Sequence, residues 1–337
     1  MLRGGDRDGR RGGRSIVASM TRRPRSGLQL ELRHDDLRAV VTDVGASLRA
    51  FAAGGRDLVV PFGADEVRPA YRGTTLVPWP NRVVDGRFAF GGVERQLPLT
   101  EPERGHALHG FGSWLAWPVV EHDASRVVLG LQIEPSLGYP WRIGVETTFS
   151  LGAHGLEQQV RAKNLGDDAA PWGTGPHPYL RAGDAPLDEW TLSLPASTVL
   201  LVTDDRLAPT GLAPVERDAE RFDFREPRAI GHVEIDHAYT DVERDDDELA
   251  RVRVTDPGSG QGVEMAWDAS CPWVQIHTAD LPAGPSHPGH RAGLAVEPMT
   301  CAPDALNDER YPFDTGLVVL EPGGTHAASW SIAPVRA

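Results

Sequence analysis

The sequence predicts an all-β fold, organised as one large antiparallel β-sandwich. Short segments in which apolar and polar residues alternate recur along the chain, while no segment with helical periodicity exceeds about two turns. The 337 residues include 37 glycines and 28 prolines, a content typical of many short strands joined by turns. No convincing linker follows Gly27, so we expect residues 27–337 to form a single domain.

Strands and turns alternate at the start of the expected domain. Residues 28–32 alternate strictly between leucine and polar side chains, and residues 34–36 supply a polar turn into the next strand. Residues 78–82 break this pattern with two prolines, and residues 86–92 predict a hairpin turn that ends in two glycines. The strands expected here are 28–32, 37–41, 43–51 and 58–60.

The rest of the chain predicts a continuous series of antiparallel strands. Residues 141–149 place Trp, Ile, Val, Thr and Phe side chains on one face, which we expect to be buried. A turn at His154 and Gly155 should join this strand to residues 156–163, and the acidic tract 245–248 should be a solvated loop. The further strands expected are 126–133, 190–201, 231–242, 250–255, 262–267, 273–278, 293–296, 317–320 and 327–332.

Charge is distributed unevenly along the chain, whose net charge is −14. Residues 1–26 contain eight arginines and two aspartates, which gives this segment +6 and leaves −20 for the remainder. We expect residues 1–26 to be a disordered basic tail, although Met20 offers a later start and an organellar or nucleic-acid-binding tail is a weaker alternative. The acidic body argues against nucleic acid or an anionic membrane as the main partner.

The apolar runs and the cysteines of the sequence indicate the cellular compartment in which we expect the protein. No apolar run reaches the length of a membrane-spanning helix, so we expect a soluble protein. The two cysteines, Cys271 and Cys301, imply no disulfide framework and suit small reduced core residues. We therefore expect a cytoplasmic protein. We also expect it to be a monomer or a weak homodimer.

His177 is the first candidate for proton transfer, because histidine titrates nearest to neutral pH. It lies between Pro176 and Pro178, which restrict the backbone on both sides. A rigid, aromatic-flanked histidine suits a proton-transfer site and equally suits a packed turn, and spacing alone leaves these alternatives even. His109 lies in a similar turn-like segment beside Gly110.

Glu297 is the carboxylate that stands out. It ends the apolar run 293–296 and precedes Pro298, an arrangement that delivers a carboxylate to the rim or interior of a sheet. Burial would raise its pKa from about 4.3 toward neutrality, where a general base works best. The alternative is an exposed glutamate at a strand end. Asp236 has a similar apolar setting, and Arg82 is the basic group of an aromatic-rich loop.

Other kinds of chemistry find little support in the sequence. The pairs His106/His109 and His287/His290 have a spacing that suits a metal, but no Cys, Asp or Glu ligand accompanies them. Neither a nucleophile elbow nor a glycine-rich phosphate loop occurs, and the chain's single lysine is Lys163. We therefore expect no metal and no cofactor, and an acid–base pair of His and Glu on a β scaffold.

Five segments in order resemble motifs of the aldose 1-epimerase (galactose mutarotase) family. The similarity extends over about residues 28–335, nearly the whole body of the chain. No single motif is specific, but the five in the same order and rough spacing make a strong resemblance. The segments are Asn81-Arg82 with Gly86-Arg87-Phe88, Ala107-Leu108-His109-Gly110-Phe111, Gly175-Pro176-His177-Pro178-Tyr179, Asp236-His237-Ala238-Tyr239 and Val296-Glu297-Pro298.

The resemblance implies a β-supersandwich that interconverts the α- and β-anomers of an aldose without a cofactor. Glu297 would remove the C1 hydroxyl proton, and His177 would protonate the ring oxygen as the ring opens. His109 would form a hydrogen bond near the ring oxygen. Sugar hydroxyls would be held by Arg82, Asp236 and the neighbouring Asn81. Its partner would then be a small aldose sugar of the glucose or galactose type.

Departures from the family pattern leave the sugar open. His106 stands where the family usually has Asn, Leu180 replaces a usual Phe, and the proline-rich loop 282–290 matches poorly. A hexose-6-phosphate 1-epimerase is one alternative, with a phosphate held by Arg72, Arg181 and Arg291. A non-catalytic sugar-binding protein of the same fold is another, which substitution of His177 or Glu297 would have favoured.

Overall fold

The computed structural model describes residues 22–335. Residues 1–21 of the expected basic tail therefore lie outside the described residues. At the end of that segment, Ser26 is buried, and its backbone N–H donates to the carbonyl of Ala64 over 3.0 Å. The chain is thus fixed to the body by Ser26, one residue before the expected start of the domain.

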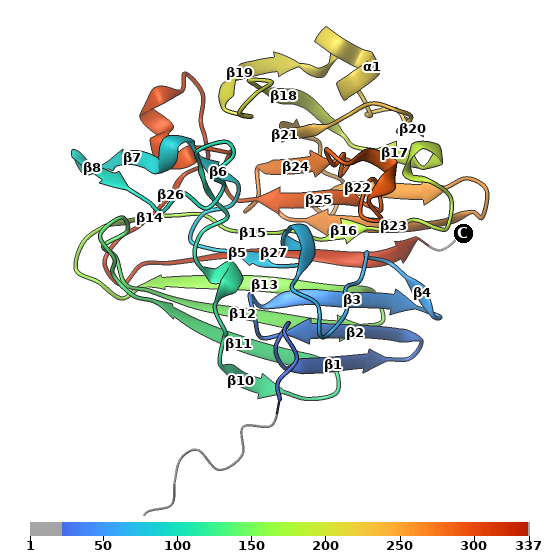
Figure 1. Cartoon of the computed structure of the whole chain (residues 1–337), viewed down its shortest axis with the longest axis horizontal. Coiled ribbons are helices and arrows are strands. Elements are labelled where there is room, and N and C mark those ends of the chain that lie inside the picture. The colour runs from blue at the N-terminus through green and yellow to red at the C-terminus, as the bar shows by residue number, and fades with distance from the viewer. Residues whose placement is uncertain (1–21, 336–337) are drawn as a thin grey trace, which may run out of the picture.

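Two large antiparallel sheets and a smaller one form the body (Figure 1). The nine-stranded sheet contains β10 (Val119–His122), β11 (Arg126–Ile133), β12 (Ile143–Gly152), β13 (Gly155–Asn164), β27 (Thr325–Val335), β23 (Gln261–Trp267), β22 (Ala250–Asp256), β17 (Thr191–Ser193) and β20 (Arg228–Ala229), in this order. The six-stranded sheet contains β16 (Tyr179–Leu180), β25 (Leu294–Met299), β24 (Trp273–His277), β21 (Asp236–Val242), β18 (Ala196–Val202) and β19 (Pro209–Pro214). The four-stranded sheet contains β1 (Gln29–His34), β2 (Leu37–Thr42), β3 (Ser47–Ala53) and β4 (Arg56–Asp57).

The remaining elements are short strands and helical turns, most of which lie in the connections between the strands of the three sheets. The remaining strands are β5 (Thr75–Leu76), β6 (Arg82–Val83), β7 (Arg87–Phe90), β8 (Val93–Gln96), β9 (Ala107–Leu108), β14 (Ala170–Trp172), β15 (Gly175–Pro176) and β26 (Val318–Leu320). The helices are α1 (Ala219–Phe222) and the 3-10 turns Pro69–Tyr71, Val84–Gly86, Gly112–Trp114, Leu187–Glu189, Val215–Asp218, Gly284–Ser286 and Ala305–Arg310.

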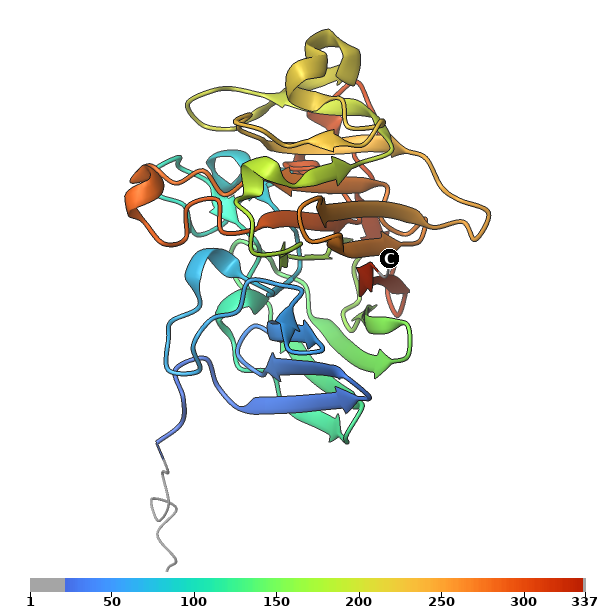
Figure 2. The ribbon, with the colours of Figure 1, turned by 90° about the vertical axis from the view of Figure 1, so that its right-hand side faces the viewer.

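The sheets form two layers, which confirms the predicted all-β sandwich. Figures 1 and 2 show the four-stranded sheet over the end of the nine-stranded sheet that holds β10–β12, and the six-stranded sheet over the end that holds β22 and β23. One continuous apolar core lies between the layers and includes residues of all three sheets. Burial of this interior is the main stabilising contribution to such a fold.

The hairpin of β12 and β13 shows how the residue pattern determines the structure. The alternating apolar residues predicted to share one face in 141–149 are all buried. β12 and β13 pair in unbroken register from Ile143 with Asn164 to Gly152 with Gly155, so the predicted turn is confirmed. Because side chains alternate between faces, this register directs the apolar side of both strands into the core.

The segment 190–201 differs from its predicted single strand. It divides into β17 and β18, which belong to different sheets and are separated by Leu194 and Pro195. Proline has no N–H to donate, so it interrupts the ladder where the chain passes from one layer to the other. The expected strand 231–242 is also shorter, because regular pairing begins only at Asp236.

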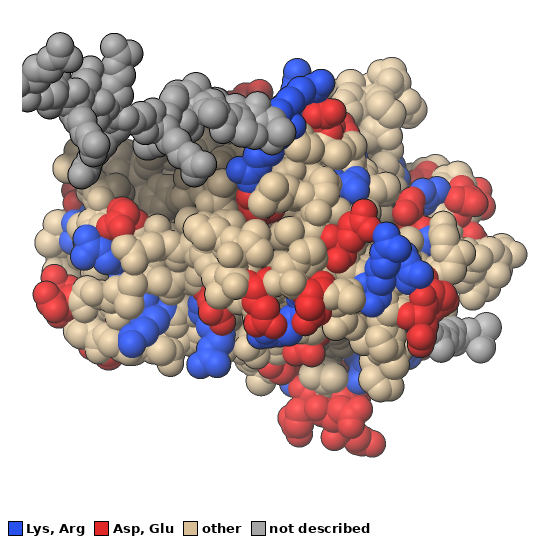
Figure 3. Space-filling view, turned by 90° about the horizontal axis from the view of Figure 1, so that it is seen from below, with Lys and Arg blue, Asp and Glu red and all other residues tan. Residues whose placement is uncertain are grey.

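Surface charge and helix length bear on the expectation that neither nucleic acid nor a membrane is the main partner. The face seen in Figure 3 carries basic and acidic side chains interspersed, without a continuous basic surface among the residues drawn in colour. Within residues 22–335, no helix is long and apolar enough to cross a membrane.

Candidate active site

The six-stranded sheet presents four polar side chains on one face. Strand β25 carries Glu297, β24 carries Gln275 and His277, and β21 begins with Asp236. Glu297 lies opposite Gln275, and His277 lies opposite Asp236. Residues opposite each other in antiparallel strands point to the same face, and so do residues two apart in one strand. Strand pairing alone therefore gathers these four groups.

His177 reaches this face from the short connection between β15 and β16. Its backbone N–H donates to Thr74, and its carbonyl accepts from Gly73 over 2.7 Å, so both backbone groups are held. Its ring Nε2 lies 3.5 Å from Oε1 of Glu297. Both side chains are almost inaccessible, with 7% and 2% exposure. The histidine is thus part of a rigid turn and also the neighbour of a buried carboxyl group.

His109 and Asn81 fix each other through two hydrogen bonds. The N–H of His109 donates to the carbonyl of Asn81 over 2.9 Å, and the N–H of Asn81 donates to Nδ1 of His109 over 3.1 Å. Both residues have left-handed backbones, with φ of 61° and 54°, a conformation uncommon outside glycine. Because Nδ1 is an acceptor, the ring carries its proton on Nε2. His109 therefore offers a hydrogen-bond donor.

Arg82 is anchored by two carboxylates. Its guanidinium forms a bidentate pair with Glu101, over 2.9 and 3.1 Å, and lies 3.7 Å from a carboxylate oxygen of Asp236. The side-chain oxygen of Asn81 accepts from the N–H of Arg82 over 2.8 Å, so its amide NH₂ is the group left for a ligand. Gln275 donates to Asp236 over 2.6 Å.

All six residues predicted as site residues line one cavity of about 120 Å³. Sequence reasoning did not assign to the site Ala70, Tyr71, Leu108, Gln275 or His277, which line the cavity too. Tyr179 also lines the cavity, and its ring stacks on that of His177 with 5.3 Å between the ring centroids. Three tryptophans outside the cavity lining are buried core residues, namely Trp79, Trp172 and Trp273.

Burial and neighbouring charges shift the pKa of the central groups. Burial, reinforced by the charge of Asp236, raises the pKa of Glu297 well above its usual value. Burial, with a further contribution from His277, lowers the pKa of His177 to about 3. Burial acts to raise the pKa of Asp236, but the charges of His277 and Arg82 outweigh it and lower the pKa to about 2.

Both shifts favour an acid–base pair with a single proton, carried by Glu297 rather than by His177. The reaction as first envisaged starts from an ionised glutamate and a protonated histidine, whereas both shifts favour the neutral forms. The reason is that taking a charged group out of water costs more than the attraction between the two partners returns. Both arrangements contain the same number of protons and differ only in which partner carries the proton.

Three buried polar atoms of the cavity have no hydrogen-bond partner among the described residues. They are Oε2 of Glu297, Nδ1 of His177 and Oε1 of Gln275. Buried polar groups are nearly always bonded, so such a group needs an explanation. Convergence of three on one cavity indicates a binding site for a polar ligand.

The remaining histidine candidates act as structural acceptors. Nδ1 of His106 accepts from the N–H of Asp85, and its Nε2 lies 2.9 Å from the carbonyl of Arg206. The Nδ1 atoms of His287 and His290 accept from backbone N–H groups of their own loop. Between residues 22 and 335, no three His, Cys, Asp or Glu side chains are arranged so that they could hold a metal ion.

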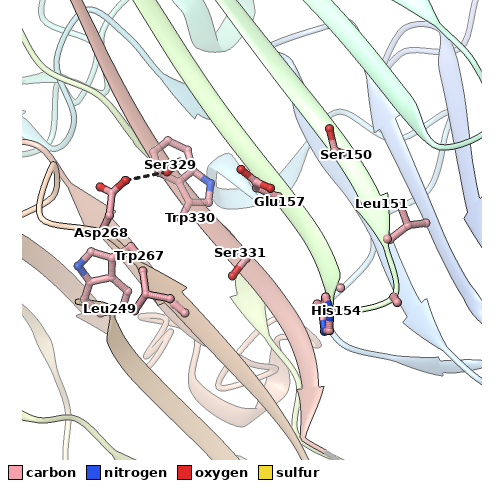
Figure 4. Close-up of a pocket in the computed structure, with 14 residues that line it drawn as sticks. Ser150, Leu151, His154, Glu157, Leu249, Trp267, Asp268, Ser329, Trp330 and Ser331 are labelled. Atoms are coloured by element: carbon pink, nitrogen blue, oxygen red, sulfur yellow. Dashed lines mark hydrogen bonds between the residues drawn. The ribbon is translucent and has the colours of Figure 1, made fainter. Parts of the chain in front are cut away.

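A larger hollow lies on the solvent-facing side of the nine-stranded sheet, away from these residues (Figure 4). This sheet-face hollow has a volume of about 450 Å³ and is lined by 150–155, Glu157, Leu249, 266–268 and 329–331. Asp268 accepts a hydrogen bond from Ser329 over 2.8 Å, and the other labelled polar side chains are spread along the strands. Among the described residues that line the hollow, no histidine is paired with a carboxylate.

Comparison with known proteins shows relatives over most of the chain. A family profile described as aldose 1-epimerase matches residues 29–333. The uncharacterized protein YihR of Escherichia coli (strain K12) is 34% identical over 91% of this chain and 93% of its own length. Galactose mutarotase of Mus musculus is 28% identical over 88% of this chain and 90% of its own. The crystal structure of a GalM/aldose epimerase homologue from C. elegans has the same fold, with a TM-score of 0.77 and 20% identity over 92% of this chain and 99% of its own. The chain belongs to the aldose 1-epimerase family.

Proposed function

We propose that this protein is an enzyme that interconverts the α- and β-anomers of a hexose of the glucose or galactose type. The observation that carries the proposal is the buried His177–Glu297 pair, 3.5 Å apart, in a cavity with unpartnered polar atoms. Exchange of anomers requires only that one proton leaves the C1 hydroxyl and another reaches the ring oxygen. A positioned base and acid suffice for this, each contributing about 10²–10⁴-fold.

The reaction then has three steps. Glu297 takes the proton of the C1 hydroxyl while His177 gives one to the ring oxygen, and the bond between C1 and the ring oxygen breaks. The open-chain aldehyde rotates about C1–C2. The ring closes on the other face of the carbonyl as the neutral His177 takes back the proton and Glu297 returns the other to the new C1 oxygen.

In the protein without sugar, the favoured distribution of protons between Glu297 and His177 is the one expected after ring opening. After ring opening, Glu297 is protonated and His177 is neutral, which is the arrangement that burial favours. Binding of a cyclic sugar requires one proton to pass from Glu297 to His177 within the pair. The positive charge of Arg82, which lowers the pKa of Glu297, favours this transfer. The site is therefore matched to the open-chain intermediate.

The other groups of the cavity would orient the sugar. His109 presents an Nε2–H donor, because its Nδ1 already accepts from Asn81. The pKa of His109 lies well below its usual value because of burial and the charge of His177, so it acts as a neutral donor. Asp236 remains ionised and accepts from sugar hydroxyls, while Arg82 donates to them. Charged partners make such hydrogen bonds stronger than neutral ones.

Two of the three arginines proposed to bind the phosphate of a hexose 6-phosphate are already paired with carboxylates. Arg181 is paired with Asp57 and Asp184, and Arg291 with Asp188 and Asp280. None of these arginines lines the active-site cavity. A neutral hexose is therefore the favoured substrate.

Polarimetry on a small sugar panel tests the proposal. Freshly dissolved α-D-glucose and α-D-galactose should relax to their equilibrium rotation faster with the protein than in buffer alone. Acceleration seen only with glucose 6-phosphate would support the phosphate alternative. Unchanged relaxation of every sugar, with circular dichroism showing folded protein, would favour a non-catalytic sugar-binding role.

A further inference from the structure

Tyr71 lies against both histidines of the active-site cavity. Its ring centroid is 4.7 Å from that of His109 and 6.3 Å from that of His177, and the planes of the Tyr71 and His177 rings differ by 21°. Tyr179 is also nearly parallel to His177, at 22°, and His109 meets His177 edge-on with 5.0 Å between the centroids. The imidazole of His177 is thus surrounded by other rings.

Hydrogen bonds constrain the ring of His177 weakly. The outer side-chain torsion of histidine has no sharp preference, and a catalytic imidazole is usually oriented by a hydrogen bond at its second nitrogen. Nδ1 of His177 has no hydrogen-bond partner among the described residues. Its Nε2 lies 3.5 Å from Glu297, which is longer than a typical hydrogen bond. The orientation of this imidazole therefore depends on packing against its aromatic neighbours.

His109 is constrained at one point. Its Nδ1 accepts from the N–H of Asn81, and a single contact at one atom leaves the ring free to tilt about it. The ring of Tyr71 meets the imidazole of His109 at an angle of 58° and limits this tilt. The direction of the Nε2–H of His109 therefore depends on Tyr71 as well as on Asn81.

The backbone that carries Tyr71 is strained and held in place. Ala70 and Tyr71 have left-handed backbones, with φ of 43° and 55°. Such conformations are costly outside glycine and persist where the surrounding structure imposes them. The N–H of Thr74 donates to the carbonyl of Tyr71 over 3.1 Å, and the carbonyl of Thr74 accepts from the N–H of His177 over 3.1 Å. The Tyr71 turn and the His177 turn are therefore fixed relative to each other.

Arg68 joins the same turn to the segment that carries His109. This arginine is buried, and its guanidinium donates to the hydroxyl of Ser47 and to the carbonyl of Ser113. The hydroxyl of Ser113 in turn donates to the carbonyl of His109 over 3.1 Å. Tyr71 is thus held on a short rigid segment that is tied to both histidines.

We propose that Tyr71 is a positioning residue of the anomer exchange, whose ring orients the imidazoles of His177 and His109 toward the sugar. The inference rests on the proposed function and adds to it a residue that transfers no proton itself.

Replacing the ring and keeping the ring give opposite expectations, which polarimetry of glucose and galactose can measure. Tyr71→Leu keeps an apolar side chain without the ring, so kcat should fall about 10- to 100-fold, because misplaced reacting groups slow the chemical step. KM should change little, since the sugar-binding groups remain. Tyr71→Phe keeps the ring and should recover most of the lost kcat.

Each contrary result has a distinct meaning. An increase in KM with unchanged kcat in Tyr71→Leu would show that the ring serves sugar binding and would overturn the positioning role. An unchanged kcat in Tyr71→Leu, or an equal loss of kcat in Tyr71→Phe, would overturn it too. A wild-type protein that accelerates neither sugar would overturn the proposed function, and this role with it.

A second ring-free variant and a matched control complete the test. Circular dichroism should show that Tyr71→Leu is folded, and Tyr71→Met replaces it if it is not. Phe90→Leu removes another half-buried ring, which meets Trp141 edge-on with 5.3 Å between the centroids and lies outside the cavity lining. This control should leave kcat and KM unchanged, and a loss of kcat equal to that of Tyr71→Leu would contradict a specific role of Tyr71.

Discussion

The active-site cavity and the sheet-face hollow differ in whether their buried polar atoms have hydrogen-bond partners, and their volumes do not follow this difference. The hollow encloses about 450 Å³ and the active-site cavity about 120 Å³. Yet the smaller space contains the unpartnered buried atoms of His177, Gln275 and Glu297, whereas no such atom among the described residues lines the hollow. Volume alone would favour the hollow over the smaller cavity, whereas the desolvated acid–base pair favours the smaller cavity as the candidate site.

Replacing one histidine in each region gives the largest expected contrast. His177→Gln removes the group that exchanges a proton with the ring oxygen, and should lower the rate of anomer exchange by about 10²–10⁴-fold. His154→Gln, the same change at an exposed position in the sheet-face hollow, should leave the rate unchanged. Polarimetry of both variants decides the comparison. Equal rates in the two would mean that His177 serves only to hold its turn.

The pH dependence sharpens the comparison further. The pair is active while it holds one proton, so kcat/KM should fall as His177 gains a proton near pH 3 and again as Glu297 loses its own at higher pH. Asp236 raises the pKa of Glu297, so Asp236→Asn should move the upper limit to lower pH. It should also reduce kcat/KM about 10- to 100-fold, because a charged hydrogen-bond partner is lost. An upper limit that stays in place would disprove this coupling.

Thermal stability should show the smallest effect. Between pH 4.5 and the raised pKa of Glu297, the unfolded chain is ionised while the folded one keeps its proton, so this group destabilises the fold increasingly as pH rises. Glu297→Gln removes that cost and should raise Tm by a few degrees at pH 7, with less gain toward pH 4.5. Glu157→Gln, an exposed glutamate of the sheet-face hollow, should show no such dependence. A pH-independent gain in Glu297→Gln would refute the linkage.

Much of the fold and of the site could be predicted because the signals are local. The β12–β13 hairpin follows from side-chain alternation around a turn, and Glu297 follows from an apolar run that precedes glutamate and proline, although β25 continues to Met299 and places Glu297 inside the strand. His177 is restricted by the two prolines beside it in the chain. The structure holds its backbone through Thr74 and Gly73, so the packed turn and the place beside Glu297 are compatible.

What could not be predicted depends on contacts distant in sequence. Gln275 and His277 enter the site only because β24 lies between β21 and β25. Tyr71 lines the cavity from a 3-10 turn with a left-handed backbone, which no periodicity reveals. The position of the proton on the acid–base pair depends on burial, which a sequence does not specify quantitatively.

The central claim is that Glu297 exchanges a proton with the C1 hydroxyl, and Glu297→Gln tests it most directly. Glutamine keeps the size of the side chain and cannot take up the proton. Polarimetry of fresh α-D-glucose and α-D-galactose should show acceleration by the wild type and by Glu157→Gln, and relaxation at the rate of buffer alone with folded Glu297→Gln. Acceleration by Glu297→Gln equal to that of the wild type would contradict the proposed mechanism.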